Sequence, residues 1–250
     1  MNRLIKAEIF RLRQNLPFMI LCTAVFVTIS ILNATESIDQ DLGVQIIDLQ
    51  GSAIIMMFAL MVLPCVFAAV TGKIYDNGKL GRYEIMAGNK TAAIVFSKLI
   101  TDGILFLIVS VIGCCGYYIF IGFYRGTGEF DHALLRLLLI VVVLAHIAFC
   151  SILIALCVRK HALGAVICYI RFLILDSAGI PFIVWLAGTV LGKEKLALHI
   201  AHTSLMNQMM ILISEPVNSM IVLHVLIGLL VESALWYLII DLGIKKRKIA

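Results

Sequence analysis

The chain has 250 residues, of which 62% are hydrophobic and only 14% are charged, and its mean hydropathy is +1.07. Soluble domains are about half apolar, so this composition excludes a water-soluble globular protein and indicates a membrane protein. The net charge of +5 does not indicate nucleic-acid binding, because the basic residues gather in alternate loops between apolar stretches. These stretches are continuous and about 20 residues long, which predicts transmembrane helices and not the alternating strands of a barrel.

Six apolar stretches predict an all-α, polytopic membrane protein with six transmembrane helices in a single domain, residues 1–250. Four of the stretches contain no Asp, Glu, Lys or Arg, and they lie at residues 14–35, 51–72, 103–124 and 137–158. Two further stretches, residues 162–192 and 216–240, are as apolar but carry charged residues. The first stretch is longer than the apolar core of a signal peptide and no cleavage pattern follows it, so it is predicted to be a span.

The distribution of Lys and Arg predicts the orientation, because positive residues stay on the cytoplasmic side in short loops. With the N terminus inside, fifteen of the twenty basic residues are cytoplasmic: Arg3, Lys6, Arg11, Arg13, Lys73, Lys79, Arg82, Lys90, Lys98, Arg159, Lys160, Lys245, Lys246, Arg247 and Lys248. The predicted outer loops contain only Arg125, Arg136, Lys193 and Lys195. Both termini of this multi-pass protein are therefore expected in the cytoplasm.

The N-terminal segment combines an apolar stripe with basic residues, which favours a helix lying in the membrane interface. The apolar residues at helical spacing are Ile5, Ile9, Leu12 and Leu16. The basic residues that fall largely off this stripe are Lys6, Arg11 and Arg13. An ordinary positively charged flank that only orients the first span is the alternative.

The longest cytoplasmic loop, residues 73–98, is too polar to span and too patterned for a flexible linker. A turn at residues 76–78 precedes a short predicted helix, and Gly88 and Asn89 end that helix before the third span. Its candidate contact residues are Leu80, Arg82, Tyr83, Glu84 and Met86. Such a helix would lie across the cytoplasmic face and dock into a soluble partner, whereas the alternative is a solvated loop shaped only by topology.

The outer segment between spans five and six is apolar yet contains several polar residues, which favours an amphipathic or re-entrant segment. His199 and His202 have a spacing that suits a metal, but no further nearby ligand is evident in the sequence, so no metal site is predicted. The cysteines form no metal-binding or disulfide pattern, and they are interpreted as small buried apolar residues: Cys22, Cys65, Cys114, Cys115, Cys150, Cys157 and Cys168.

Three ionisable residues, Arg171, Asp176 and Glu232, lie inside the predicted spans, where a charge is costly. Arg171 lies ten residues after His161, at the cytoplasmic edge of span five, and Glu232 lies nine residues before Asp241 on span six. At about 1.5 Å per residue both lie about 14 Å deep, so an Arg171–Glu232 ion pair between antiparallel helices is predicted.

The same count places Asp176 and His224 at similar depths and suggests a second pair, unless Gly179 and Pro181 break span five. Two roles remain open for these residues. They either only hold helix five against helix six, or they take part in opening a pathway through the membrane.

Several catalytic patterns are absent from the sequence. It contains no phosphate-binding loop, no H-E-x-x-H zinc motif and no G-x-S-x-G nucleophile elbow. The chain is therefore expected to have no catalytic residue, metal or cofactor of its own, and it does not hydrolyse ATP by itself.

The basic start MNRLIKAEIFRLRQN, the loop containing YEIMAGNKTAAIVFSKLI and the apolar outer segment are together similar to the permease subunits of type-2 ABC exporters. The likeness is to bacterial lantibiotic or peptide-antibiotic immunity and efflux permeases, and it is one of layout over the whole chain. It implies a dimer of permeases in the bacterial plasma membrane, bound to two cytoplasmic ABC ATPase subunits. The substrate would be a peptide, antibiotic or other amphipathic molecule.

The resemblance also assigns roles to segments. The stretch from Leu80 to Ala87 would be the coupling helix that contacts the ATPase, and the stretch from Leu196 to Leu212 would cap the pathway on the outside. An ion-coupled secondary transporter or channel using Arg171, Asp176 and Glu232 is the alternative. A membrane-embedded enzyme is a third hypothesis, without a recognisable catalytic pairing.

Overall fold

The structure is a computed structural model that describes residues 5–10, 13, 20, 63–72, 88, 90–125, 133–158, 160–214 and 217–249. All regular elements among these residues are helices, which confirms the all-α prediction. Four of the described helices are long and apolar enough to cross a membrane, within Ala92–Ile112, Leu135–Val158, Ala162–Val190 and Ser219–Leu242. The predicted first span lies outside the described residues except for position 20, and of the second only the apolar helix Leu63–Gly72 is described.

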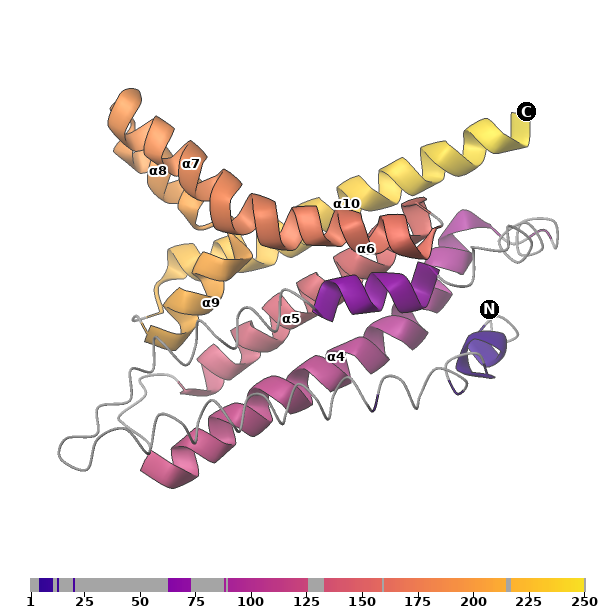
Figure 1. The fold of residues 1–250 in the computed structure, drawn as a ribbon, viewed down its shortest axis with the longest axis horizontal. Helices are drawn as coiled ribbons and strands as arrows, with labels where there is room; N and C mark the ends of the chain where they lie inside the picture. Colours follow the sequence, from indigo (N-terminus) through magenta and orange to yellow (C-terminus); the bar gives the residue numbers. More distant parts are fainter. Residues whose placement is uncertain are drawn as a thin grey trace.

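Helices α4 (Thr91–Arg125) and α5 (Ala133–Val158) run side by side, with α5 between α4 and α10 in the view of Figure 1. Helix Leu63–Gly72 packs on them, and the ring of Phe67 stacks on that of Phe106 with 4.1 Å between centroids. Helix α4 begins well before the predicted start of span three at residue 103, because Lys98 and Asp102 are buried in the helix and not left in a loop.

The predicted fifth span, at residues 162–192, is one continuous helix from His161 to Val190 whose winding changes along its length, and this helix is called the fifth span below. It consists of α6 (His161–Tyr169), the π-helix η1 (Ile170–Gly179), α7 (Ile180–Trp185) and the π-helix η2 (Leu186–Val190). The break at Gly179 and Pro181 that the sequence left open does not occur, since Pro181 lies in the first turn of α7, where its missing N–H is tolerated.

Two short helices, α8 (Glu194–Ala201) and α9 (Leu205–Ser214), connect the fifth span to α10 (Ser219–Ile249). Helix α8 folds back along α7 after a turn at Gly192, which has a positive φ of 62°. Helix α9 packs against α5, and so does α10 over much of its length (Figure 1). The described part of the predicted outer segment is therefore a pair of helices joined by a tight turn.

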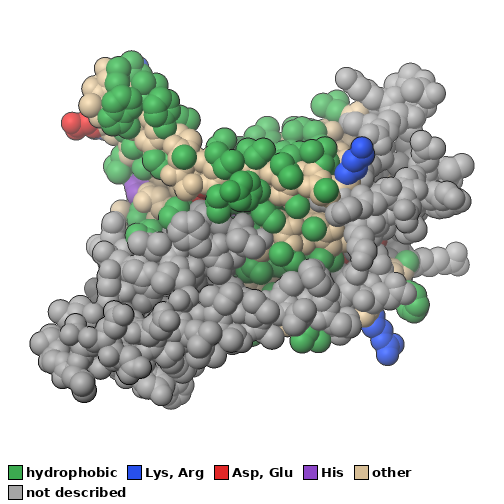
Figure 2. Space-filling model, in the orientation of Figure 1, with side chains coloured by type: hydrophobic (Ala, Val, Ile, Leu, Met, Phe, Trp, Pro, Cys, Tyr) green, Lys and Arg blue, Asp and Glu red, His purple; other side chains and the backbone are tan. Residues whose placement is uncertain are grey.

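Hydrophobic side chains cover the outer surface of the fifth span in Figure 2. Exposed large apolar residues on this span and on α10 include Leu175, Phe182, Trp185, Leu230, Leu235 and Leu238. A water-soluble protein rarely exposes an apolar surface of this kind, whereas lipid solvates it well. The exposed surface thus supports the same conclusion as helix length, which is that the chain is a multi-pass membrane protein.

Candidate functional site

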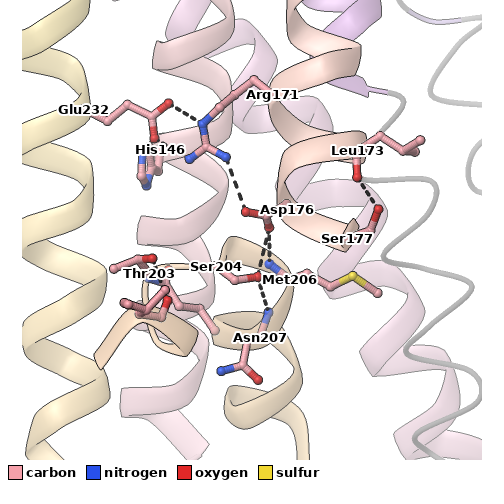
Figure 3. A network of polar contacts seen from close by, with 12 residues as sticks. His146, Arg171, Leu173, Asp176, Ser177, Thr203, Ser204, Met206, Asn207 and Glu232 are labelled. Atoms are coloured by element: carbon pink, nitrogen blue, oxygen red, sulfur yellow. Dashed lines mark hydrogen bonds and ion pairs between the residues drawn. The ribbon is translucent and has the colours of Figure 1, made fainter. Parts of the chain in front are cut away.

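The predicted ion pair between Arg171 and Glu232 is present and is bidentate. Arg171 donates from Nε to Glu232 Oε1 at 2.8 Å and from Nη2 to Oε2 at 2.6 Å. Figure 3 shows the guanidinium of η1 facing the carboxylate of α10. The planar fork of arginine matches a carboxylate in this arrangement, so the pair fixes orientation as well as charge.

The π-helical winding of η1 adds Asp176 to this pair. In an α-helix, positions 171 and 176 would point about 140° apart. In η1 the backbone bonds link residues five apart, as in the bond from the N–H of Ile180 to the carbonyl of Leu175, so the two side chains share a face. Arg171 Nη1 donates to Asp176 Oδ1 at 3.3 Å.

Asp176 connects the network to the turn between α8 and α9. Its Oδ2 accepts the hydroxyl of Ser204 at 3.2 Å and the backbone N–H of Met206 at 2.8 Å. Ser204 Oγ in turn accepts the backbone N–H of Asn207 at 3.1 Å (Figure 3). A single buried carboxylate therefore fixes the start of α9 against the fifth span.

His146 of α5 completes the network and was not predicted from the sequence. Its Nε2 lies 3.1 Å from Glu232 Oε2, and because a carboxylate only accepts, Nε2 carries the proton and donates. Trp236, one turn further along α10, donates its indole N–H to Glu232 Oε1 at 3.4 Å. The available signal was a histidine in the middle of a predicted span without Asp, Glu, Lys or Arg.

The network joins α5, the fifth span, the α8–α9 turn and α10 through one cation and two carboxylates. His146, Cys150 and Glu232 also offer ligand atoms that lie within 4.8 Å of one another. Arg171 binds both oxygens of Glu232, however, so a metal ion there has to compete with a bidentate guanidinium. The geometry suits a charge-relay or helix-pairing role better than a metal centre.

The suggested pair between Asp176 and His224 is not formed. His224 instead forms a hydrogen bond with His199, in which His224 Nε2 lies 3.3 Å from His199 Nδ1. The other ring nitrogen of His224, Nδ1, lies 2.7 Å from the carbonyl oxygen of Met220. Asp176 does not pair with His224 because it bonds instead to Arg171 and to the α8–α9 turn.

A second set of buried polar contacts lies at the other end of the bundle, near the start of α4. Lys98 Nζ lies 2.5 Å from Glu8 Oε1, with both side chains buried. The hydroxyl of Thr71 donates to Asp102 Oδ2 at 3.1 Å. These contacts attach the helix at residues 5–10 and the end of helix Leu63–Gly72 to α4.

The predicted ATPase-contact residues lie outside the described part of the chain: Leu80, Arg82, Tyr83, Glu84 and Met86. Of the candidate residues within the membrane, the structure brings together Arg171, Asp176 and Glu232 and leaves His224 in a different cluster.

Comparison of the chain with protein-family models, with curated proteins and with solved structures found no match.

Proposed function

We propose that this chain is the permease subunit of an ATP-driven ABC exporter in the bacterial plasma membrane. It has six spans with both termini in the cytoplasm, works as a dimer with a second permease, and binds cytoplasmic ATPase subunits that hydrolyse ATP for it. It moves a peptide, antibiotic or other amphipathic substrate outward. The support for this proposal is the arrangement of elements around the loop between residues 73 and 90.

The observation that carries the proposal is the anchoring of residues 5–10 to α4 by the buried Glu8–Lys98 pair. The Thr71–Asp102 bond joins the two helices that flank the loop in the same region. These contacts join the two helices on either side of residues 73–90 to each other and to residues 5–10, so we expect the three helices to move together. In the proposal, a motor protein that pushes on these helices tilts the attached spans.

The far end of the bundle contains elements that can respond to such tilting. The fifth span, the α8–α9 turn and α10 are joined through Arg171, Asp176 and Glu232, so in the proposal they shift together when the helices that flank residues 73–90 tilt. Helices α8 and α9 lie at the end of the bundle opposite the helix at residues 5–10 (Figure 1). In the proposal they close the outer end of the pathway.

The test is co-purification of the tagged chain from its own cells, followed by assay of vanadate-sensitive ATP turnover. We expect an ATPase to co-purify and Tyr83→Ala with Glu84→Ala to abolish its binding. The matched control is Lys193→Ala with Glu194→Ala, an exposed neighbouring pair on the predicted outer side. Absence of any ATPase, together with no vanadate-sensitive turnover, would overturn the proposal.

The contact between Glu8 and Lys98 has its own test. Lys98→Met removes the cation that contacts Glu8, so we expect transport to fall while the chain still inserts and still binds the ATPase. Normal transport by Lys98→Met would show that the anchoring of residues 5–10 plays no part in coupling.

An ion-coupled transporter is the second candidate, favoured by the buried chain from His146 through Glu232 and Arg171 to Asp176. Transport that continues in the absence of ATP and stops when the proton gradient is collapsed would support it against the exporter. Transport that requires ATP and survives collapse of the gradient would exclude it.

A further inference from the structure

The polar network around Arg171 has one negative charge in excess. Arg171 contributes one positive charge, whereas Asp176 and Glu232 each contribute a negative charge when they are ionised. A net charge inside a membrane is costly, so a further positive charge is expected at the network. Among the residues that the structure describes, His146 is the other basic side chain in contact with these carboxylates, and it supplies a positive charge when it binds a proton.

The carboxylates themselves are poorly placed to take up that proton. Within the described residues, Glu232 accepts four hydrogen bonds, two of them from Arg171. Asp176 accepts three, from Arg171 and from the α8–α9 turn. Bonds donated to a carboxylate stabilise its ionised form, and a protonated carboxyl would need an acceptor where these contacts provide donors.

His146 has a ring nitrogen that is available for a proton. Its Nε2 already donates to Glu232, so Nδ1 of the neutral ring has a lone pair (Figure 3). The residue is only 3% exposed, and Nδ1 has no hydrogen-bond partner among the described atoms. A buried acceptor without a partner is destabilising, which favours any change that gives Nδ1 a bond.

Gln208 of α9 places a second buried acceptor beside the same ring. A Cβ at Gly228 would lie 3.9 Å from His146 Nδ1 and 4.0 Å from Gln208 Nε2, so both side chains flank this glycine. Gln208 Nε2 donates to the carbonyl of His202 at 2.8 Å, whereas Oε1 of the same amide is buried without a partner in the described part of the chain. Two acceptors cannot bond to each other, but a proton on Nδ1 makes the ring a donor to Oε1.

The ionisable groups near His146 come from four helices. They are Cys150 of α5, Cys168 of α6, Arg171 and Asp176 of η1, and Glu232 of α10. Helix α9 contributes the uncharged amide of Gln208, and the buried charged residues of α4, Lys98 and Asp102, bond to Glu8 and Thr71. A thiol that ionises adds negative charge, so neither cysteine can balance the network.

We propose that His146 is a proton-binding site. A proton from solvent adds to the lone pair of Nδ1 and is donated to Gln208 Oε1, while the proton on Nε2 stays donated to Glu232. The imidazolium then balances the network, whose charge changes between zero and one negative charge as this proton is bound and released. The assignment concerns the bound proton alone, so it stands whether ATP or a proton gradient drives transport.

The experiment is NMR spectroscopy of the full-length chain in detergent, with isotope-labelled histidine, between about pH 8 and about pH 5. The signals of His146 are identified by their loss in His146→Gln or, if that variant does not fold, by contact of the Cε1 proton with Gly228. We expect both ring nitrogens to carry protons at the acidic end while the chain is still folded. A ring that keeps a bare Nδ1 over the whole range would overturn the site.

Asp176→Asn tests the charge balance. The change removes the excess negative charge, and within the described network Asp176 is connected to His146 only through Arg171 and Glu232. We expect proton binding at His146 to weaken about tenfold, which lowers the titration midpoint by about one pH unit. Asp102→Asn, at a buried carboxylate in α4, is the matched control and should leave the midpoint unchanged. An unchanged midpoint in Asp176→Asn would contradict the proposal.

Gln208→Leu tests the acceptor. Loss of a hydrogen bond to a charged ring should also weaken proton binding about tenfold. The matched control is Asn207→Leu, which removes the neighbouring amide of α9, whose Nδ2 donates to the carbonyl of Ala201. A midpoint that is unchanged or raised in Gln208→Leu would show that the amide does not accept from Nδ1, and the site would be wrong.

Discussion

The two halves of the described bundle are held together differently. Within their apolar windows, 67% of the α5 residues and 44% of those in α4 are buried, against 22% in the fifth span and 11% in α10. The first half is joined mainly by apolar packing, as in the stacked rings of Phe67 and Phe106, with the polar contacts of Lys98 and Asp102 confined to the first part of α4. The second half exposes most of its apolar surface and carries the charge network.

This difference shows what the buried charges do for the fold. Helix α10 packs mainly on α5, and so does α6, which continues into η1. Contact between η1 and α10 is therefore made by long side chains, Arg171 from η1 and Glu232 from α10. Arg171 also reaches Asp176 on its own helix. Where lipid solvates apolar surface as well as protein does, polar contacts decide which helices associate.

The largest expected effect comes from Arg171→Met. The change leaves the carboxylates of Glu232 and Asp176 without their shared cation, and removing one partner of a buried pair costs about 3 to 5 kcal/mol. We expect a strongly lowered midpoint of thermal unfolding in detergent, or loss of the protein from the membrane.

The control is the triple variant Arg171→Met, Asp176→Asn and Glu232→Gln, which removes the carboxylates together with the cation. It should be more stable than Arg171→Met alone, since no buried charge is then left without a partner. A triple variant less stable than the single one would contradict the assignment of the loss to unpaired charge.

A smaller loss is expected for Glu232→Gln. Arg171 keeps Asp176, and the amide oxygen still accepts from His146, so the change removes charge-assisted bonds worth about 1.5 to 3 kcal/mol. Unfolding midpoints of Glu232→Gln, Arg171→Gln and the double variant form a cycle that measures the coupling between the two residues. Coupling near zero would mean that the ion pair contributes nothing to holding η1 near α10.

The length of the apolar stretches and the depth of charged residues within them predicted much of the described bundle from the sequence. Continuous apolar stretches gave the all-α class and the approximate positions of the four described spans, because the bilayer sets the length of a span. Counting residues from the cytoplasmic edge placed Arg171 and Glu232 at one depth, and the pair is present. Depth is predictable from the sequence because it depends only on the rise per residue.

Angular position was not predictable in the same way. The contact between Arg171 and Asp176 depends on π-helical winding, which an assumed α-helix hides. Charged residues also marked boundaries wrongly, since Lys98 was assigned to a loop and is buried against Glu8. A side chain that finds a distant partner overrides local hydropathy, and the sequence does not reveal that partner.

Gly103→Ala tests the tight packing of the first half. A Cβ at this position in α4 would lie 3.1 Å from Phe149 Cδ1 and 2.8 Å from Cε1, and the second distance is closer than Cβ atoms approach other atoms in proteins. Overpacking costs about 1 to 3 kcal/mol, which outweighs the gain of about 1 kcal/mol in helix propensity. We expect a lowered unfolding midpoint, and recovery when Phe149→Leu is added. A variant as stable as the unaltered chain would show that α4 and α5 are not closely packed there.

Gly228→Ala is the matched change in the second half and should have the smallest effect. A Cβ at this position in α10 would meet His146 Cε1 at 3.6 Å and Gln208 Nε2 at 4.0 Å, which are ordinary contacts. With no clash to oppose it, the propensity gain of at most about 1 kcal/mol should leave the unfolding midpoint equal or slightly raised. If Gly228→Ala destabilised the protein as much as Gly103→Ala does, α10 would be packed as tightly as α4, and the charge network would no longer be needed to explain how the second half stays together.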